Sequence, residues 1–413
     1  MSLSEHDLAA LRSLAGPYAE LAHLDVQRER IERYRKTNDI ESVRPPVLID
    51  EVPWGEIRDE SLTNRCAKEL AWLEGGLRRS LYQWAHFQAD MVIPPVFQIR
   101  KHIRSSGIGL DVRDRRIDGA TGSHIAAHEY TDQLAAEADL EKLALPVITY
   151  DQDGTERARE QAEAVFAGLL PVEIVGHVFH FSMWDEIARY RGVANLLLDL
   201  AARPGLMHRT AARFRDIGLA TFRQLVEKDL LHATPLLLHC TPACTRNLPA
   251  PDFAGTVRPQ DTWGRCAAQI LGSVSPDMHD EFDFSYAAPL VSACGLVYYG
   301  CCEPLDRKIA LLRKRFRNLR KISITPWADV DRAAQNIGRD FVLAAKPNPA
   351  FVSSRTFDPK PVEEEIERCL VACRRHGTVC EFVLKDISTI ANDPRNLTQW
   401  AATASRVIDR FYG

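Results

Sequence analysis

The sequence predicts an α/β protein, a (β/α)8 TIM-type barrel with an N-terminal helical extension. Two observations carry this prediction. Short apolar runs recur from about residue 44 onward, and segments with helical spacing of apolar residues separate them. Apolar strands that alternate with amphipathic helices indicate parallel strands covered by helices. Eight such runs favour closure into a barrel.

The N-terminal segment is predicted to be helical. Residues 5–36 show helical spacing of Leu and Ala with few breakers, and Arg44-Pro45-Pro46 should end any helix before the first strand. We therefore expect an N-terminal helical extension over residues 1–43 and one barrel domain over residues 44–413. A chain of 413 residues with 46% apolar content is long enough to bury such a core.

Eight apolar runs are the candidate strands. They are VLID at 47–50, MVIPPVF at 91–97, VEIVG at 172–176, LLLHC at 236–240, LVYYGCC at 296–302, KISIT at 321–325, FVLAAK at 341–346 and EFVLKD at 381–386. The helical segments between them include 184–203, 211–231, 328–338 and 362–377. An open doubly wound sheet is the rival, but no run is followed by a GxGxxG or GxxxxGK[ST] loop.

Composition excludes several classes of partner. The net charge of −4 comes from 52 basic and 56 acidic residues without a like-charge block, so we expect no nucleic-acid or membrane partner and a small-molecule substrate. The N-terminus lacks the apolar core of a signal peptide, which predicts a cytoplasmic protein. In that reducing compartment most of the ten cysteines are expected to be small buried residues.

Polar residues follow most of the predicted strands. In a parallel barrel the C-terminal strand ends converge on one face, where reacting groups collect. The candidate catalytic residues are Asp50, Lys346, Lys385 and Asp386. The candidate substrate-binding residues are Glu51, Trp54, His177, His239, Trp327 and Asn348.

The segment YYGCCEPLD at 298–306 is the most informative of these strand ends. Cys301, Cys302 and Glu303 are candidate metal ligands, because Zn²⁺ is satisfied by Cys sulfur with His or carboxylate. The alternative is that one thiol faces the core and the other packs against a helix. Neighbouring strand residues point to opposite faces, so both thiols reach one site only if the strand is irregular there.

Two predicted strands end in a lysine. A buried ammonium is costly, so Lys346 and Lys385 should meet an anion such as a substrate carboxylate. Asp386 or Asp50 could then transfer protons or, for Asp386, bind a metal. An equally good interpretation of Lys385 and Asp386 is an ion pair that joins neighbouring loops.

The order of motifs resembles the uroporphyrinogen decarboxylase superfamily, which includes the decarboxylase and the zinc-dependent cobalamin methyltransferases. The stretches that carry the resemblance are RPPVLIDEVPW at 44–54, DTWGRCAAQILGSVSPDMHDEF at 261–282, GLVYYGCCEPLD at 295–306, KISITPWADVDRAAQNIG at 321–338, KPNPA at 346–350 and KDISTIANDPRNL at 385–397. The resemblance implies a (β/α)8 barrel, a homodimer, a zinc ion and a corrinoid protein as methyl acceptor.

The chain departs from the family pattern at the metal strand. The methyltransferases carry a His-x-Cys pair there, whereas this chain has Gly300 at the place of the His and Cys302 at that of the Cys. The first strand also lacks the arginine pattern of the decarboxylase, which argues against a tetrapyrrole substrate. The leading hypothesis is a methyltransferase that acts on a small substrate with zinc activation. The rivals are a metal-free decarboxylase or lyase and a non-catalytic binding barrel.

Overall fold

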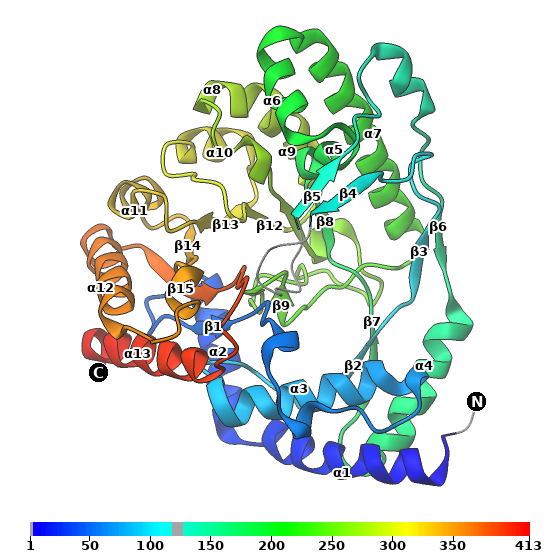
Figure 1. The fold of residues 1–413 in the computed structure, drawn as a ribbon, viewed down its shortest axis with the longest axis vertical. Coiled ribbons are helices and arrows are strands. Elements are labelled where there is room, and N and C mark those ends of the chain that lie inside the picture. The colour runs from blue at the N-terminus through cyan, green and yellow to red at the C-terminus, as the bar shows by residue number, and fades with distance from the viewer. Residues whose placement is uncertain (1–2, 118–126) are drawn as a thin grey trace.

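The computed structural model describes residues 3–117 and 127–413 of the chain, which form a mixed α/β fold around one parallel sheet (Figure 1). Seven strands make this sheet in the order β1-β15-β14-β13-β12-β11-β8, and all six neighbouring pairs are parallel. Their bounds are β1 Val47–Ile49, β8 Phe179–Phe181, β11 Trp263–Cys266, β12 Leu296–Tyr299, β13 Leu319–Ile324, β14 Val342–Ala345 and β15 Val379–Leu384.

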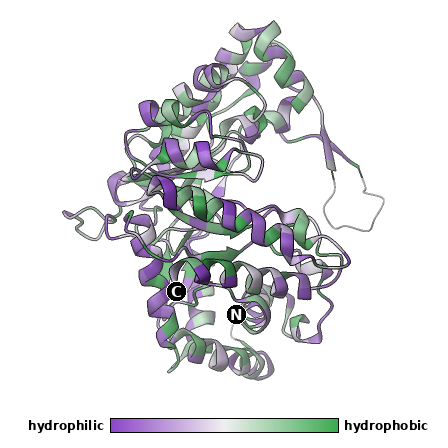
Figure 2. Ribbon diagram, turned by 90° about the vertical axis from the view of Figure 1, so that its left-hand side faces the viewer, coloured by the Kyte–Doolittle hydropathy of each residue, from purple (hydrophilic) through white to green (hydrophobic). Residues whose placement is uncertain are grey.

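Helices surround the sheet, and Figure 1 shows α10, α11, α12 and α13 on its outer side. Their polar and apolar residues alternate, as the mixed colours along single helices show in Figure 2. The helices are α1 Glu5–Ala22, α2 Asp25–Asn38, α3 Ala71–Phe87, α4 Gln152–Phe166, α5 Met183–Arg191, α6 Val193–Ala202, α7 Pro204–Glu227, α8 Pro276–His279, α9 Ser285–Val291, α10 Ile309–Arg315, α11 Val330–Ile337, α12 Pro359–His376 and α13 Arg395–Tyr412.

The predicted helices are confirmed, with changes at their ends. The N-terminal segment forms α1 and α2, and the segment at 184–203 is split into α5 and α6 at Gly192, which has a positive φ of 78°. Helix α11 begins after Asp329, whose side chain accepts a hydrogen bond from the Arg332 N–H. Such a cap satisfies a backbone donor that the first helical turn leaves free.

Five of the eight predicted strands contribute to the main sheet or its edge as expected, namely those that contain β1, β12, β13, β14 and β15. The other three runs do not join the main sheet. The run at 172–176 forms β7, Val172–Val175, which pairs with β2, Phe97–Arg100, and β2 begins at the last residue of the run at 91–97. The run at 236–240 forms a short antiparallel hairpin of β9, Leu237–Leu238, with β10, Thr241–Pro242.

Two strands of the main sheet, β8 and β11, were not predicted. Each carries a polar residue inside a short apolar segment, His180 in β8 and Arg265 in β11, and this interrupts the apolar run that indicates a buried strand. Strand β11 also contains Gly264, where an added Cβ would lie 2.8 Å from the Cys294 Sγ. The helix behind this strand therefore packs directly against its backbone.

The sheet has two edges, β1 and β8, that do not pair with each other in the described part of the chain. The structure therefore has an open sheet of seven parallel strands with helices outside, where a closed barrel of eight strands was expected. Short additional strand pairs, β3 Ile103–Ser105 with β6 Ile148–Tyr150 and β4 Asp114–Ile117 with β5 Ala127–Tyr130, lie outside the main sheet. No helix in residues 3–117 and 127–413 combines the length and apolar character needed to cross a membrane.

The N-terminal helices pack against the rest of the fold. Tyr34 of α2 is fully buried with Leu48 of β1 and Val383 of β15, and its hydroxyl donates to the Asp90 carbonyl at 2.6 Å. Helix α1 packs against α3 and α4 through apolar residues that include Leu11 and Ala15. These contacts fix β1, and with it the residues that follow β1, against the last strand.

Candidate functional site

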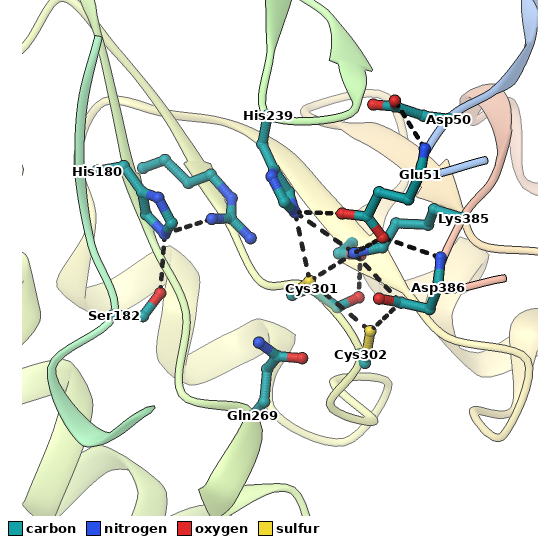
Figure 3. Close-up of polar contacts among 12 residues, drawn as sticks. Asp50, Glu51, His180, Ser182, His239, Gln269, Cys301, Cys302, Lys385 and Asp386 are labelled. Carbon is teal, nitrogen blue, oxygen red and sulfur yellow. Dashed lines mark hydrogen bonds and ion pairs between the residues drawn. The ribbon is translucent and has the colours of Figure 1, made fainter. Parts of the chain in front are cut away.

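Six polar side chains from four separate segments meet at the C-terminal ends of the strands. Glu51 follows β1, His239 follows β9, Cys301 and Cys302 follow β12, and Lys385 and Asp386 follow β15. Figure 3 shows them pointing toward one another. We call these six residues the polar cluster.

The loop after β12 is held by specific contacts. Gly300 has a φ of 104°, and a Cβ there would lie 2.8 Å from Leu305 Cδ1 and 3.0 Å from Ser323 Cβ. Only glycine fits both the conformation and the space. The Ser323 hydroxyl donates to the Cys301 carbonyl at 2.6 Å, and the Glu303 carboxylate accepts the Cys301 N–H at 2.9 Å. This loop therefore presents both thiols to one site, although neighbouring residues within a strand would point apart.

Cys301 and Cys302 form a thiolate and thiol pair. Their Sγ atoms are 3.7 Å apart, and the Cys302 Sγ lies 2.6 Å from the Asp386 Oδ2. The hydrogen bond from Cys302, helped by His239 and Lys385, lowers the pKa of the Cys301 thiol far below its ordinary value. The same hydrogen bond, together with burial, raises the pKa of Cys302. Cys301 is thus the nucleophilic or metal-binding sulfur of the pair at neutral pH.

Lys385 lies at the centre of the polar cluster with 2% of its surface exposed. Its Nζ is 2.9 Å from the Cys301 Sγ, 3.2 Å from the Asp386 Oδ2 and 3.8 Å from a Glu51 oxygen. Burial alone lowers the pKa of Lys385, but the neighbouring thiols, Cys240 first, outweigh burial and raise it. Lys385 is therefore a fixed ammonium that stabilises the Cys301 thiolate.

Three residues of the polar cluster have left-handed backbone conformations. The φ angles are 52° at Glu51, 57° at His239 and 54° at Asp386. Such a conformation costs a residue with a Cβ about 1–2 kcal/mol. The Glu51 N–H donates to the Asp50 carboxylate at 2.8 Å, and the Asp386 N–H donates to the Glu51 carboxylate at 2.9 Å. Backbone strain at three strand ends of one site is typical of functional positions.

Cys301, Cys302 and Asp386 form a donor set for a metal ion. One ligand atom from each lies within 4.8 Å of the others. Two sulfurs bound to one tetrahedral Zn²⁺ at about 2.3 Å are about 3.8 Å apart, which matches the observed 3.7 Å. The Asp386 oxygen is closer to Cys302 than a shared zinc ion would allow, and its 46% exposed side chain has room to move outward. Three ligands would leave a fourth position open for substrate.

Glu303 lies outside this donor set. Its carboxylate is 1% exposed, and each of its two oxygens accepts a backbone N–H, from Ala268 and from Cys301. Burial raises the pKa of Glu303, while these hydrogen bonds oppose the rise. The structure thus places Glu303 as a support for the Cys301 loop, and Asp386 supplies the carboxylate near the thiols.

A cavity of about 650 Å³ opens beside the polar cluster. His239 lines it and also lies 3.8 Å from the Cys301 Sγ, which joins the cavity to the thiols. Asp50 and His177, both expected at the site, line the same cavity. Loss of hydration lowers the pKa of His177, and the positive charge of Arg100 lowers it further. The cavity is large enough for a metabolite.

The remaining predicted residues are elsewhere. Lys346 is buried, and its Nζ lies 5.7 Å from the centre of the Tyr298 ring. Trp54 packs against Tyr82 and Phe87 at one side of the core. The Asn348 side chain accepts the Ala350 N–H and caps a short helix. Trp327 is 71% exposed and contacts no residue of the polar cluster.

Several residues of the cavity were not predicted from the sequence to bind a ligand. Arg265 and His180 lie on the two unpredicted strands, and Arg100 and His232 lie near strand ends that were assigned differently. The surrounding protein, with the Arg265 charge, lowers the pKa of His180 to about 3. A signal was present, since an arginine between Trp263-Gly264 and Cys266-Ala267 is unusual in an otherwise apolar segment.

Comparison with known proteins finds similarity at the level of the fold. No protein-family model matches the sequence, and no curated protein matches it. Its fold is similar to that of a methyltransferase from Methanosarcina mazei. The TM-score is 0.50, the sequence identity is 12%, and the match covers 93% of this chain and 99% of that chain. At this identity the similarity describes the fold.

Proposed function

We propose that this protein is a methyltransferase that acts on a small substrate and binds zinc through Cys301, Cys302 and Asp386. The observation that carries the proposal is the pair of sulfurs 3.7 Å apart at a strand end, with a carboxylate beside them. The fold similarity to a methyltransferase agrees with it. When bound, zinc supplies Lewis acidity, which lowers the pKa of a coordinated thiol or hydroxyl.

The residues around the donor set have defined tasks in this proposal. Glu303 and Ser323 hold the Cys301 backbone, so the sulfur keeps its place when a ligand enters. Lys385 has to leave the thiols for a metal to bind, and Glu51, 3.8 Å away, is the acceptor for its ammonium. His239 faces the cavity and can donate a hydrogen bond to the substrate atom that loses or gains the methyl group.

The proposal includes the finer features that the family resemblance implies. The seven parallel strands would be the wall of a (β/α)8 barrel, with consecutive strands in sequence order and helices outside. A corrinoid protein would be the methyl acceptor, and the enzyme would be a homodimer. Uroporphyrinogen decarboxylase-like ancestry accounts for the order of the sequence motifs.

Metal analysis tests the proposal. We expect close to one zinc per chain in protein purified without chelator or metal-affinity resin, measured by inductively coupled plasma mass spectrometry. Cys302→Ala should lose the metal, while Cys66→Ala, a cysteine outside the polar cluster, should keep it. Replacement of zinc by cobalt(II) should give the strong near-ultraviolet absorption of thiolate ligands, absent from Cys302→Ala. Metal-free wild-type protein that takes up no cobalt would refute the zinc mechanism.

Lys346 favours a second candidate, a metal-free decarboxylase or lyase. Its ammonium is 4% exposed and has no hydrogen-bond partner among the described residues, so a substrate carboxylate could bind there. Lys385 would assist, and Asp386 or Asp50 would transfer protons. In this case Lys346→Met abolishes activity while Cys302→Ser stays active. The zinc proposal expects Cys302→Ser to be inactive.

A further inference from the structure

Arg265 is a buried guanidinium that forms no ion pair with a carboxylate among residues 3–117 and 127–413. It is 1% exposed on β11, its Nη2 donates to the Gly300 carbonyl at 3.3 Å, and its Nη1 contacts the His180 ring nitrogen. Its Nε has no partner in the described part of the chain. Arginines this deeply buried are almost always paired with an acid, because an unpaired buried charge is costly. Cys301 and Glu303 act on it electrostatically, but neither forms a hydrogen bond with the guanidinium in the described part of the chain, so the Nε position is open to another acceptor.

The cavity beside Arg265 carries a positive charge. Arg265 and the exposed Arg100 both line it, and Asp50 is the only carboxylate among the lining residues. One Asp50 oxygen already accepts the Glu51 N–H. Loss of hydration lowers the pKa of three histidines that line the cavity, so these imidazoles are neutral hydrogen-bonding groups at pH 7. They are His177, His180, whose pKa is about 3, and His232, whose pKa is about 4.

A second buried cation lies close by. The Lys346 Nζ and the Arg265 Cζ lie 5.7 Å and 5.6 Å from the centre of the same Tyr298 ring. The Lys346 Nζ and the Tyr298 hydroxyl both lack a hydrogen-bond partner among the described residues. Unsatisfied polar atoms are rare in protein interiors, and three of them gather here.

We propose that the cavity binds a small organic anion, whose carboxylate or phosphate group is held by Arg265 and Arg100. Guanidinium groups form paired, charge-assisted hydrogen bonds with both kinds of anion. The His239 ring, 6.0 Å from that of His180, lies between this anion site and the Cys301 thiolate. This inference names the substrate class of the site in the proposed function. It rests on the proposed function only for the end of the substrate that faces Cys301, because anion binding by the two arginines needs no metal.

Calorimetric titration tests the site with inorganic phosphate and with malonate, at constant ionic strength, on the protein as purified and after chelator treatment. We expect one saturable site for at least one of the two anions in both preparations. Arg265→Gln should abolish binding, and Arg100→Gln should weaken it on the order of 10-fold or more. Arg410→Gln, an exposed arginine on α13, is the matched control and should bind as the wild type does. Binding of phosphate alone or of malonate alone assigns the anionic group.

Two outcomes overturn the inference: neither anion binds saturably, or Arg100→Gln and Arg265→Gln both bind like the wild type. Arg100→Gln decides if the buried variant fails to fold, because Arg100 is exposed. As a second measurement, the chelated wild type should favour iodoacetate over iodoacetamide at Cys301, relative to a free thiol, and Arg100→Gln should reduce this preference. A protein that binds the anion but no zinc would overturn only the proposed function. A protein that binds zinc but neither anion would overturn only this inference.

Discussion

Removal of the Lys385 ammonium should raise the pKa of the Cys301 thiol. The two groups are 2.9 Å apart, and at an effective dielectric constant of about 20 their attraction is about 6 kcal/mol. Solvation of the freed thiolate is expected to offset more than half of this energy. A rise of about 1–3 pKa units in Lys385→Met is therefore expected, while the hydrogen bond from Cys302 remains.

The assay is the pH dependence of alkylation by iodoacetamide in metal-free protein, followed separately at Cys301 and Cys302 by mass spectrometry. Thiolate absorbance in the ultraviolet gives an independent midpoint. Lys346→Met is the matched control, because it removes a buried ammonium that does not contact the thiols. An unchanged midpoint in Lys385→Met, or an equal shift in Lys346→Met, would show that Lys385 does not stabilise the thiolate.

Three further predictions concern stability. Lys321→Met should lower the unfolding free energy in urea by about 3–5 kcal/mol, because it leaves the fully buried Glu381 unpaired; adding Glu381→Leu should restore most of it, and no recovery would contradict this account. Gly264→Ala should cost about 1–3 kcal/mol in thermal unfolding, because its Cβ would lie 2.8 Å from the Cys294 sulfur. Burial raises the pKa of Asp185 to about 7, so the native state holds a proton that the unfolded chain releases near pH 4. The stability that this proton provides is present at low pH and is lost as the pH rises through 7. In Asp185→Asn the unfolding free energy should fall less steeply with pH in that range, by on the order of 1 kcal/mol per pH unit. Equal slopes in the wild type and the variant would refute this account.

The sequence predicted the second half of the sheet better than the first. Strands β12 and β14 are buried and read as continuous apolar runs, and β13 and β15 were recognised from their apolar residues although they carry Lys321 and Glu381. Strand β11 is fully buried and the edge strand β8 is only partly buried, and they carry Arg265 and His180, which line the cavity. The periodic pattern thus failed where side chains face a cavity instead of the core, as is expected at functional positions.

The rule that reacting groups follow parallel strands found all six members of the polar cluster. It could not tell which of them meet, because the distance between strand ends depends on how the sheet curves. It also included Trp54 and Asn348, which follow strands but serve packing and capping. Glu303 was expected as the carboxylate ligand because it is next to the thiols in the sequence. In the structure the carboxylate beside the Cys302 sulfur is that of Asp386, 84 residues further along the chain.

The left-handed backbone at Glu51, His239 and Asp386 bears on any attempt to engineer this protein. Glycine adopts this conformation freely, so glycine at each position is expected to relax the backbone while removing a side chain of the polar cluster. Directed evolution that selects for thermal stability alone would then favour thermostable variants that have lost activity. A library built on this scaffold has to be sorted for ligand binding in the same round as for melting temperature.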